Sequence, residues 1–299
     1  MEVLVLGGLG FIGHNVVRRL ADDGHTVSYI SPPTEHHSRL KEIRKEYIGT
    51  SANQIKLHWR ATERQYDVVV DCAGIPNAKA AKEFPSKLID GQLIVPTTFG
   101  FEYRPPERFQ YIYLSSSMVY GNFVGKPNEE SALNPIEPYG IVKRTAEQLF
   151  EHYNHFDYTI IRPSAVYGPR DKIERVLSKF MLGARSGRPL KVKGHHVLDF
   201  TYVDDLVDGI SKCVGNPVAY NEIFNMTRGQ GATLQYVAEA VARTVGGNVS
   251  ISYDESDPLY PTRGALDITK ASTMLGYNPT IDIEEGIRLY HDNWISEIH

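Results

Sequence analysis

The chain has 299 residues, of which 41% are hydrophobic and 23% charged, an ordinary composition for a folded protein of one large domain or two modest ones. A formal net charge of −4 without a basic stripe argues against nucleic-acid binding, and two cysteines in apolar runs predict no disulfide framework. No apolar run approaches the ~18 residues that a membrane span needs, and "MEVLVLGG" lacks signal-peptide features, so we expect a cytoplasmic protein.

The first half of the chain alternates short β-branched runs with helical patterns. Helices are predicted over residues 10–24 and 137–153, and strands over residues 2–7, 26–31, 54–59, 66–74, 109–117 and 158–168. Such alternation predicts an α/β fold of the Rossmann type, a doubly wound parallel sheet with helices on both faces. Residues 88–103 are left unassigned, because Gly91 and Pro96 interrupt the place where a helix is due.

The pattern changes after Gly168. Residues 172–187, 233–247 and 282–298 are predicted helices, the second with Thr233 as its N-cap, and residues 198–214 indicate a strand tip that leads into a helix. We therefore expect a nucleotide-binding domain over residues 1–165. Residues 166–299 would form mainly a smaller substrate-binding α/β lobe, with part of 199–225 returning to the first domain.

A glycine-rich loop, "GGLGFIG", joins the first strand to the first helix. It reads both as Gly8-x-Gly10-x-x-Gly13 and as Gly7-x-x-Gly10-x-x-Gly13. Glycines here let the backbone approach a pyrophosphate at a helix N-terminus, so the loop predicts a bound dinucleotide rather than a turn without a ligand.

The cofactor's identity should depend on the end of the second strand. That strand ends at Ser31 without the acidic residue that would hold the ribose of NAD, and Arg39 follows a few residues later. We predict NAD or NADP with a tilt to NADP. The alternative for Arg39 is an ordinary solvated charge.

Tyr139 and Lys143 lie four residues apart near the start of a predicted helix and therefore share a face. A phenol needs nearby positive charge to act as a base at neutral pH, and Lys143 together with an oxidised nicotinamide would supply it. A hydroxyl from "SSSMVYG" (115–121), at the end of the preceding strand, would position the reacting oxygen.

These motifs together resemble the extended short-chain dehydrogenases/reductases, in particular the NAD(P)-dependent nucleotide-sugar epimerases and dehydratases. The resemblance runs through "GGLGFIG", "DVVVDCAG", "YLSSSMVYG", "YGIVK", "IIRPSAVYGPRD", "DFTYVDDL", "FNMTRGQGATL" and "LDITKASTMLGYNPTIDIEEGI". It implies that Ser116, Tyr139 and Lys143 are catalytic and that Ser116, Ser117, Tyr139 and Arg263 contact substrate. It also implies cofactor contacts from Gly7, Gly10, Phe11, Ile12, Gly13, Ser31, Arg39, Ala73, Gly74, Tyr139, Lys143 and Pro163.

The chain departs from the family pattern at informative positions. Ser117 and Met118 stand where related dehydratases have an Asp–Glu pair and related decarboxylases a Glu, which disfavours dehydration. Leu198 replaces an Arg that commonly grips the substrate diphosphate, and Ala165 replaces a sugar-nucleotide Asn. Arg263 is then either a phosphate contact or a surface salt-bridge partner.

The sequence thus predicts an epimerase of a nucleotide sugar that works by transient hydride transfer through a keto intermediate. An NADPH-dependent reductase of a keto-sugar nucleotide is the alternative enzyme. A cofactor-sensing or RNA-binding relative without catalysis is the alternative of another class. We expect no metal, since the His-His pairs at 36–37 and 195–196 lack a third ligand, no membrane partner, and a homodimer by resemblance.

Overall fold

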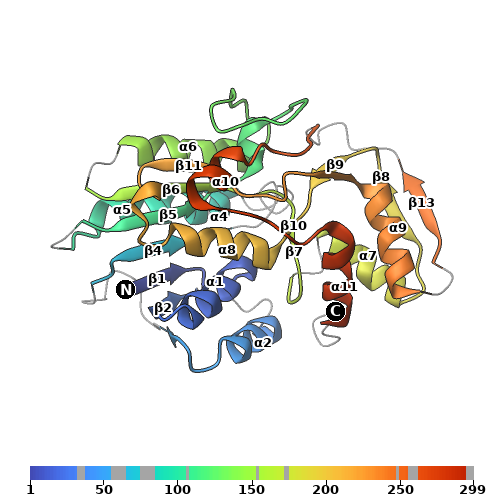
Figure 1. Cartoon of the computed structure of the whole chain (residues 1–299), viewed down its shortest axis with the longest axis horizontal. Helices are drawn as coiled ribbons and strands as arrows, with labels where there is room; N and C mark the ends of the chain where they lie inside the picture. Colours follow the sequence, from blue (N-terminus) through green and yellow to red (C-terminus); the bar gives the residue numbers. More distant parts are fainter. Residues whose placement is uncertain are drawn as a thin grey trace.

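The computed structural model describes residues 1–31, 38–54, 65–74, 85–105, 108–152, 155–171, 175–246, 249–254 and 262–293. A seven-stranded sheet forms the larger part of the molecule, and a smaller lobe extends from one side of it (Figure 1). All neighbouring strands of the large sheet are parallel. Their order is β11 (Glu222–Asn225), β6 (Asp157–Arg162), β5 (Gln110–Leu114), β4 (Val68–Asp71), β1 (Glu2–Leu6), β2 (Thr26–Ile30) and β3 (Asn53–Gln54).

Each strand of this sheet sends alternate side chains to opposite faces. Val3 and Val5 of β1 pack into the core formed with α1 (Phe11–Asp22), α2 (Ser38–Ile48) and α8 (Val203–Cys213), whereas Leu4 and Leu6 pack into the core formed with α5 (Val95–Glu102) and α6 (Pro138–His152). All four side chains are buried, as expected of a parallel strand covered on both sides. The predicted doubly wound fold is confirmed. Its strand order reverses beside β1, which opens a ligand crevice at the carboxyl ends of β1 and β4.

The unassigned segment 88–103 is helical up to Glu102, and Tyr103 is extended. It comprises the end of α4 (Pro85–Ile89), a π-helical stretch, η2 (Asp90–Ile94), and α5. Pro96 has no N–H to bond to the carbonyl of Gln92 four residues earlier, and that carbonyl instead accepts a hydrogen bond of 3.0 Å from the Tyr113 hydroxyl. The wider π turn and this replacement donor allow a helix where the sequence pattern is broken.

The smaller lobe is built on three helices, α7 (Val176–Arg185), α9 (Leu234–Val245) and α11 (Ile283–Asp292), and on short strand pairs. β8 (Leu190–Lys193) pairs with β13 (Ile251–Asp254), and β9 (Val197–Asp199) pairs with β12 (Gly231–Thr233). β7 (Val166–Tyr167) pairs with β10 (Thr201–Tyr202), and the remaining elements are α10 (Thr269–Leu275) and the 3-10 turns η3 (Ser117–Tyr120) and η4 (Pro217–Ala219).

Several predicted bounds can be compared with the structure. Thr233 accepts a hydrogen bond of 3.1 Å from the N–H of Tyr236, which confirms it as the N-cap of α9. The predicted strand over 54–59 lies, apart from Gln54, outside the described residues, and the predicted helix over 172–187 is described from Arg175 onward. In the described part of the chain, no helix has both the length and the apolar character to cross a membrane.

Candidate active site

The glycine-rich loop turns tightly between β1 and α1. Gly7 has φ +76°, and a Cβ there would lie 2.8 Å from the backbone of Ala73, so both the turn and the close approach of β4 require glycine. A Cβ on Gly13 would overlap the carbonyl of Gly7. The N–H of Gly10 bonds to that same carbonyl at 2.7 Å. The loop therefore brings the N-terminus of α1 and its unpaired N–H groups against the crevice, a cradle that fits a dinucleotide pyrophosphate.

The structure gives Arg39 local partners. It lies in the first turn of α2, exposed, with its guanidinium 3.5 Å from the carboxylate of Glu42 and 3.9 Å from that of Glu46. Ser31 follows β2 and is partly buried, but the residues between it and α2 are outside the described part of the chain. Among the described residues, Arg39 thus pairs with glutamates of its own helix.

Ser116 and Tyr139 meet across the site. Ser116 follows β5 and caps η3, where its side chain accepts a hydrogen bond of 3.2 Å from the N–H of Met118. Tyr139 lies in the first turn of α6, and its phenol is close enough to Ser116 for that hydroxyl to influence its pKa. Burial raises the pKa of Tyr139, while the charge of Arg175 and the Ser116 hydrogen bond lower it in part. Tyr139 is therefore a neutral acid until further positive charge arrives.

Lys143 is buried one turn later on the same face of α6. Its ammonium donates to the carbonyl of Leu114 at 2.5 Å and lies 5.9 Å from the centre of the Tyr139 ring. Burial lowers the pKa of Lys143 to about 8, although the nearby carboxylates of Asp71 and Glu147 raise it. The two predicted side chains and Ser116 therefore converge at the carboxyl end of β5.

The floor of the crevice continues from β4. Asp71, buried, accepts hydrogen bonds of 2.9 Å from the N–H of Ala73 and 2.8 Å from the hydroxyl of Tyr111, which fixes the turn into Ala73 and Gly74. Burial raises the pKa of Asp71, an effect opposed by these bonds and by Lys143. Cys72 packs against the core, and burial raises the pKa of its thiol. Its predicted role as core filler fits this setting.

The predicted substrate residues lie together. The Ser117 hydroxyl donates to that of Ser164 at 3.2 Å, and the guanidinium of Arg263 lies 3.5 Å from the same Ser117 oxygen. Pro163 is buried beside them, and its carbonyl accepts a hydrogen bond of 2.9 Å from the N–H of Ser117. Arg263 is thus placed at the site and not on a remote surface.

Sequence reasoning missed three residues near the site. Arg175, the N-cap residue of α7, pairs with buried Asp171 at 3.2 Å and has its guanidinium 5.8 Å from the centre of the Phe11 ring. Glu147 and Arg162 form a buried ion pair beside Ser115. A charged residue inside an apolar strand, in "YTIIRP", and a Glu one turn after Lys143 were the available signals.

Among the described residues, no group of three or more histidine, cysteine or acidic side chains is placed to hold a metal ion. The fold and the site together define an α/β enzyme class that binds a dinucleotide and carries a Ser-Tyr-Lys set. The sequence model of the NAD dependent epimerase/dehydratase family matches residues 3–227, and the chain belongs to that family.

Similar proteins come from several organisms. An uncharacterized UDP-glucose epimerase, YtcB, of Bacillus subtilis is 26% identical over 96% of both chains. UDP-glucuronic acid decarboxylase 3 of Arabidopsis thaliana is 28% identical over 98% of this chain and 89% of its own. The crystal structure of UDP-glucuronic acid 4-epimerase from Bacillus cereus, in complex with UDP-glucuronic acid and NAD, is 25% identical, covers 98% of both chains and has a TM-score of 0.87.

Proposed function

We propose that this chain is an NAD-dependent epimerase of a nucleotide sugar, with a UDP-sugar as the first candidate. The observation that carries the proposal is the convergence of Ser116, the Tyr139 phenol and the Lys143 ammonium, which lies 5.9 Å from the centre of the Tyr139 ring, with the glycine cradle of α1 in the same crevice. UDP-sugar epimerases among the similar proteins support the substrate class.

The chain's own residues supply the acid–base work. Tyr139 would remove a proton from a sugar hydroxyl and later return it, and the Ser116 hydroxyl would stabilise the charge that develops between them. The ammonium of Lys143 would favour the phenolate of Tyr139 and would hold the nicotinamide ribose. The loop over 7–13 and Lys143 would hold NAD, which would supply a reversible hydride acceptor for the sugar carbon, so that the keto form of the sugar can be reduced again on its other face. Ser117 and Arg263 would orient the substrate, with Arg263 suited to a phosphate.

We propose NAD rather than NADP as the first candidate for the cofactor. The tilt to NADP depended on Arg39, and this side chain pairs with glutamates of its own helix, while solved structures similar to this chain are complexes with NAD. The NADP preference stays a prediction that a direct comparison of the two affinities tests. The assignment of residues 1–165 to the cofactor and of most of 166–299 to substrate is part of the same proposal, as is a cytoplasmic location.

Other reactions fit the site less well. Ser117 and Met118 follow Ser116 without a carboxylate, so the acid–base pair that a dehydratase or decarboxylase would need in that stretch is missing. A reductase would use the same three side chains, and turnover separates it from an epimerase. An epimerase works with a catalytic amount of NAD, whereas a reductase consumes NADPH one for one.

The test is incubation of the protein with UDP-glucose, UDP-glucuronic acid and their dTDP, GDP and CDP counterparts in the presence of NAD, with the products followed by NMR. We expect one sugar to appear as a mixture of two epimers while the NADH absorbance stays constant. Tyr139→Phe should lower turnover by roughly 10²–10⁴-fold and leave NAD affinity within about threefold. If the amount of reduced cofactor instead changes one for one with product, by formation of NADH from the added NAD or by consumption of NADPH supplied in a parallel reaction, the reductase replaces the epimerase. An unchanged Tyr139→Phe variant would favour a non-catalytic role.

A further inference from the structure

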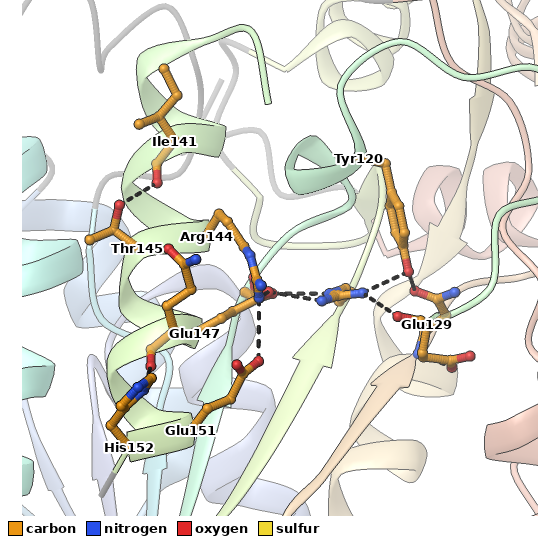
Figure 2. Close-up of polar contacts among 12 residues, drawn as sticks. Tyr120, Glu129, Ile141, Arg144, Thr145, Glu147, Glu151 and His152 are labelled. Carbon is orange, nitrogen blue, oxygen red and sulfur yellow. Dashed lines mark hydrogen bonds and ion pairs between the residues drawn. The ribbon is translucent and has the colours of Figure 1, made fainter. Parts of the chain in front are cut away.

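Glu147 lies on α6, four residues after Lys143, and its side chain is completely buried. Four donors surround the carboxylate. One oxygen accepts from the Ser115 hydroxyl at 2.5 Å and from the Arg162 Nε at 3.0 Å, and the other from the Arg162 Nη2 at 2.8 Å. Arg144 approaches the second oxygen at 3.3 Å from outside (Figure 2). The carboxylate is thus saturated by groups from β6, from α6 and from the segment that follows β5.

Arg162 is the last residue of β6 and is 1% exposed. Its remaining nitrogen, Nη1, donates to the Tyr120 hydroxyl at 2.9 Å and to the carbonyl of Glu129 at 3.3 Å. The Tyr120 hydroxyl in turn donates to Asn225, the last residue of β11, at 2.8 Å. The Glu147–Arg162 pair therefore ties α6 to the carboxyl ends of β5, β6 and β11.

The pair adjoins the proposed catalytic groups on both sides. Ser115, which Glu147 holds, directly precedes Ser116, and Arg162 directly precedes Pro163, whose carbonyl holds the N–H of Ser117. On α6, the same helix face carries Glu147 and Lys143. A change in the pair would therefore move both the serine segment and the helix that carries Tyr139.

We propose that the Glu147–Arg162 pair is a positioning device of the active site, which fixes the serine segment against α6 so that Ser116, Tyr139 and Lys143 meet. The inference rests on the proposed function for its catalytic readout. A buried ion pair is by itself weak evidence for stability, because desolvation of both charges offsets their attraction. A contribution to stability therefore does not explain why the ion pair is buried here. A role in fixing the geometry of the active site does explain it.

The decisive variant is the double substitution Glu147→Met with Arg162→Met, which leaves no lone buried charge. We expect it to fold with a melting temperature within a few degrees of wild type, to bind NAD at least fivefold more weakly, and to lose at least tenfold in kcat. Wild-type kcat and NAD affinity in this folded variant would overturn the proposal, because a structural role alone would then suffice.

Ser115→Ala gives an independent test, since it removes one contact of Glu147 and leaves the ion pair whole. We expect kcat to fall about fivefold with KM nearly unchanged, and wild-type kcat here would also count against the proposal. Arg108→Gln is the matched control. It breaks an ion pair of 2.8 Å with Asp157 at the opposite end of β6, away from the site, and should leave kcat unchanged.

The pH profile distinguishes positioning from simple loss of packing. Glu147 is one of the groups that raise the pKa of Lys143, so Glu147→Met with Arg162→Met should move the basic limb of the kcat/KM profile to lower pH. An unmoved limb of the pH profile would contradict the proposal.

The NAD affinity of the double variant can be measured without turnover. If the wild type epimerises no sugar, the proposed function fails, but the effect of the Glu147–Arg162 pair on NAD binding can still be tested. The groups that face Lys143 are Asp71 from β4, Cys72 directly after that strand, Tyr113 from β5, and Tyr139 and Glu147 from α6.

Discussion

Lys143 experiences two opposed influences at the site. Burial removes its ammonium from water and lowers its pKa to about 8, while Asp71 and Glu147 favour the charged form. Near neutral pH the charge is retained, and above pH 8 it is lost in the folded protein. Tyr139 shows the complementary effect, since burial raises its pKa and Arg175 and Ser116 oppose the rise. The acid–base pair therefore has its proton on Tyr139 and its charge on Lys143 before ligands bind.

This difference in pKa predicts how stability depends on pH. Between pH 8 and the ordinary value of 10.5, the unfolded chain keeps a proton on Lys143 that the folded protein has lost. The free energy of unfolding should therefore gain up to about 3 kcal/mol over that window from this group, relative to a Lys143→Met variant. Denaturant titrations of both proteins at several pH values measure the difference between their free energies of unfolding. The titration of the tyrosines contributes to both proteins and therefore drops out of this difference. Parallel curves for the two proteins would contradict the lowered pKa.

Arg263 permits a second prediction at the residue scale. Its guanidinium lies 3.5 Å from Ser117, so a bound phosphate could take a charge-assisted hydrogen bond there. Arg263→Met should raise KM for the nucleotide sugar by roughly 10–100-fold, with a smaller change in kcat. Steady-state kinetics measures both constants. Arg243→Met is the control, since Arg243 is exposed on α9 and paired with Glu284; an equal effect of the two variants would refute the assignment.

At the scale of elements, the sequence predicted what periodicity and local chemistry determine. The alternation of β-branched runs with helical patterns was enough for β1, β2, β4, β5 and β6 of the main sheet, and the loop over 7–13 was placed between β1 and α1. It did not predict β11 as a strand, and the strand predicted over 158–168 is divided into β6 and β7. The helix over 88–103 was not predicted, because its Pro96 depends on the Tyr113 hydroxyl, a partner from β5. The Glu147–Arg162 pair was missed for a similar reason. It joins residues 15 apart, and only packing of α6 on β6 brings them together.

The turn between β1 and α1 gives a prediction at this scale. A Cβ at Gly13 would overlap the Gly7 carbonyl, so Gly13→Ala should push α1 away from the loop and weaken NAD binding at least tenfold. Gly24→Ala is the matched control at the other end of α1. Gly24 has φ +87° with nothing within 4 Å of its Cβ position, so that variant should lose about 1 kcal/mol of stability and keep its NAD affinity. Isothermal titration calorimetry measures the NAD affinity of both variants. Wild-type affinity in Gly13→Ala would contradict the role of this loop as a pyrophosphate cradle.

At the scale of the whole molecule, the sequence places the cofactor end of the site better than the substrate end. The glycine loop is local in sequence, whereas Ser117, Ser164 and Arg263 meet only because the C-terminal segment returns to the carboxyl edge of the sheet. β11 shows the same return, since it follows α8 and joins the main sheet beside β6. Spacing along the chain does not tell which residues meet in the folded protein. The substrate residues Ser117 and Arg263 were therefore predicted from the resemblance to the family.

We propose that the homodimer predicted from the family resemblance forms through exposed apolar side chains near α6, among the described residues. Ile94 and Ile141 are both 48% exposed, on η2 and α6, two elements that pack against each other, and Leu149 is 37% exposed on α6. Exposed aliphatic side chains on neighbouring helices are typical of an interface core. Because α6 also carries Tyr139 and Lys143, pairing through this face would hold the catalytic helix in place.

Ile141→Asp tests that surface by placing a charge in it. We expect the wild type to sediment as a dimer and Ile141→Asp to shift it to monomer at micromolar concentration, with a several-fold loss of kcat because α6 loses its support. Val124→Asp is the control, since Val124 is 97% exposed in the chain between η3 and α6. A monomeric wild type would remove the dimer altogether. A dimer that survives Ile141→Asp would mean that the subunits associate through another face, so that packing within one chain alone positions Tyr139 and Lys143.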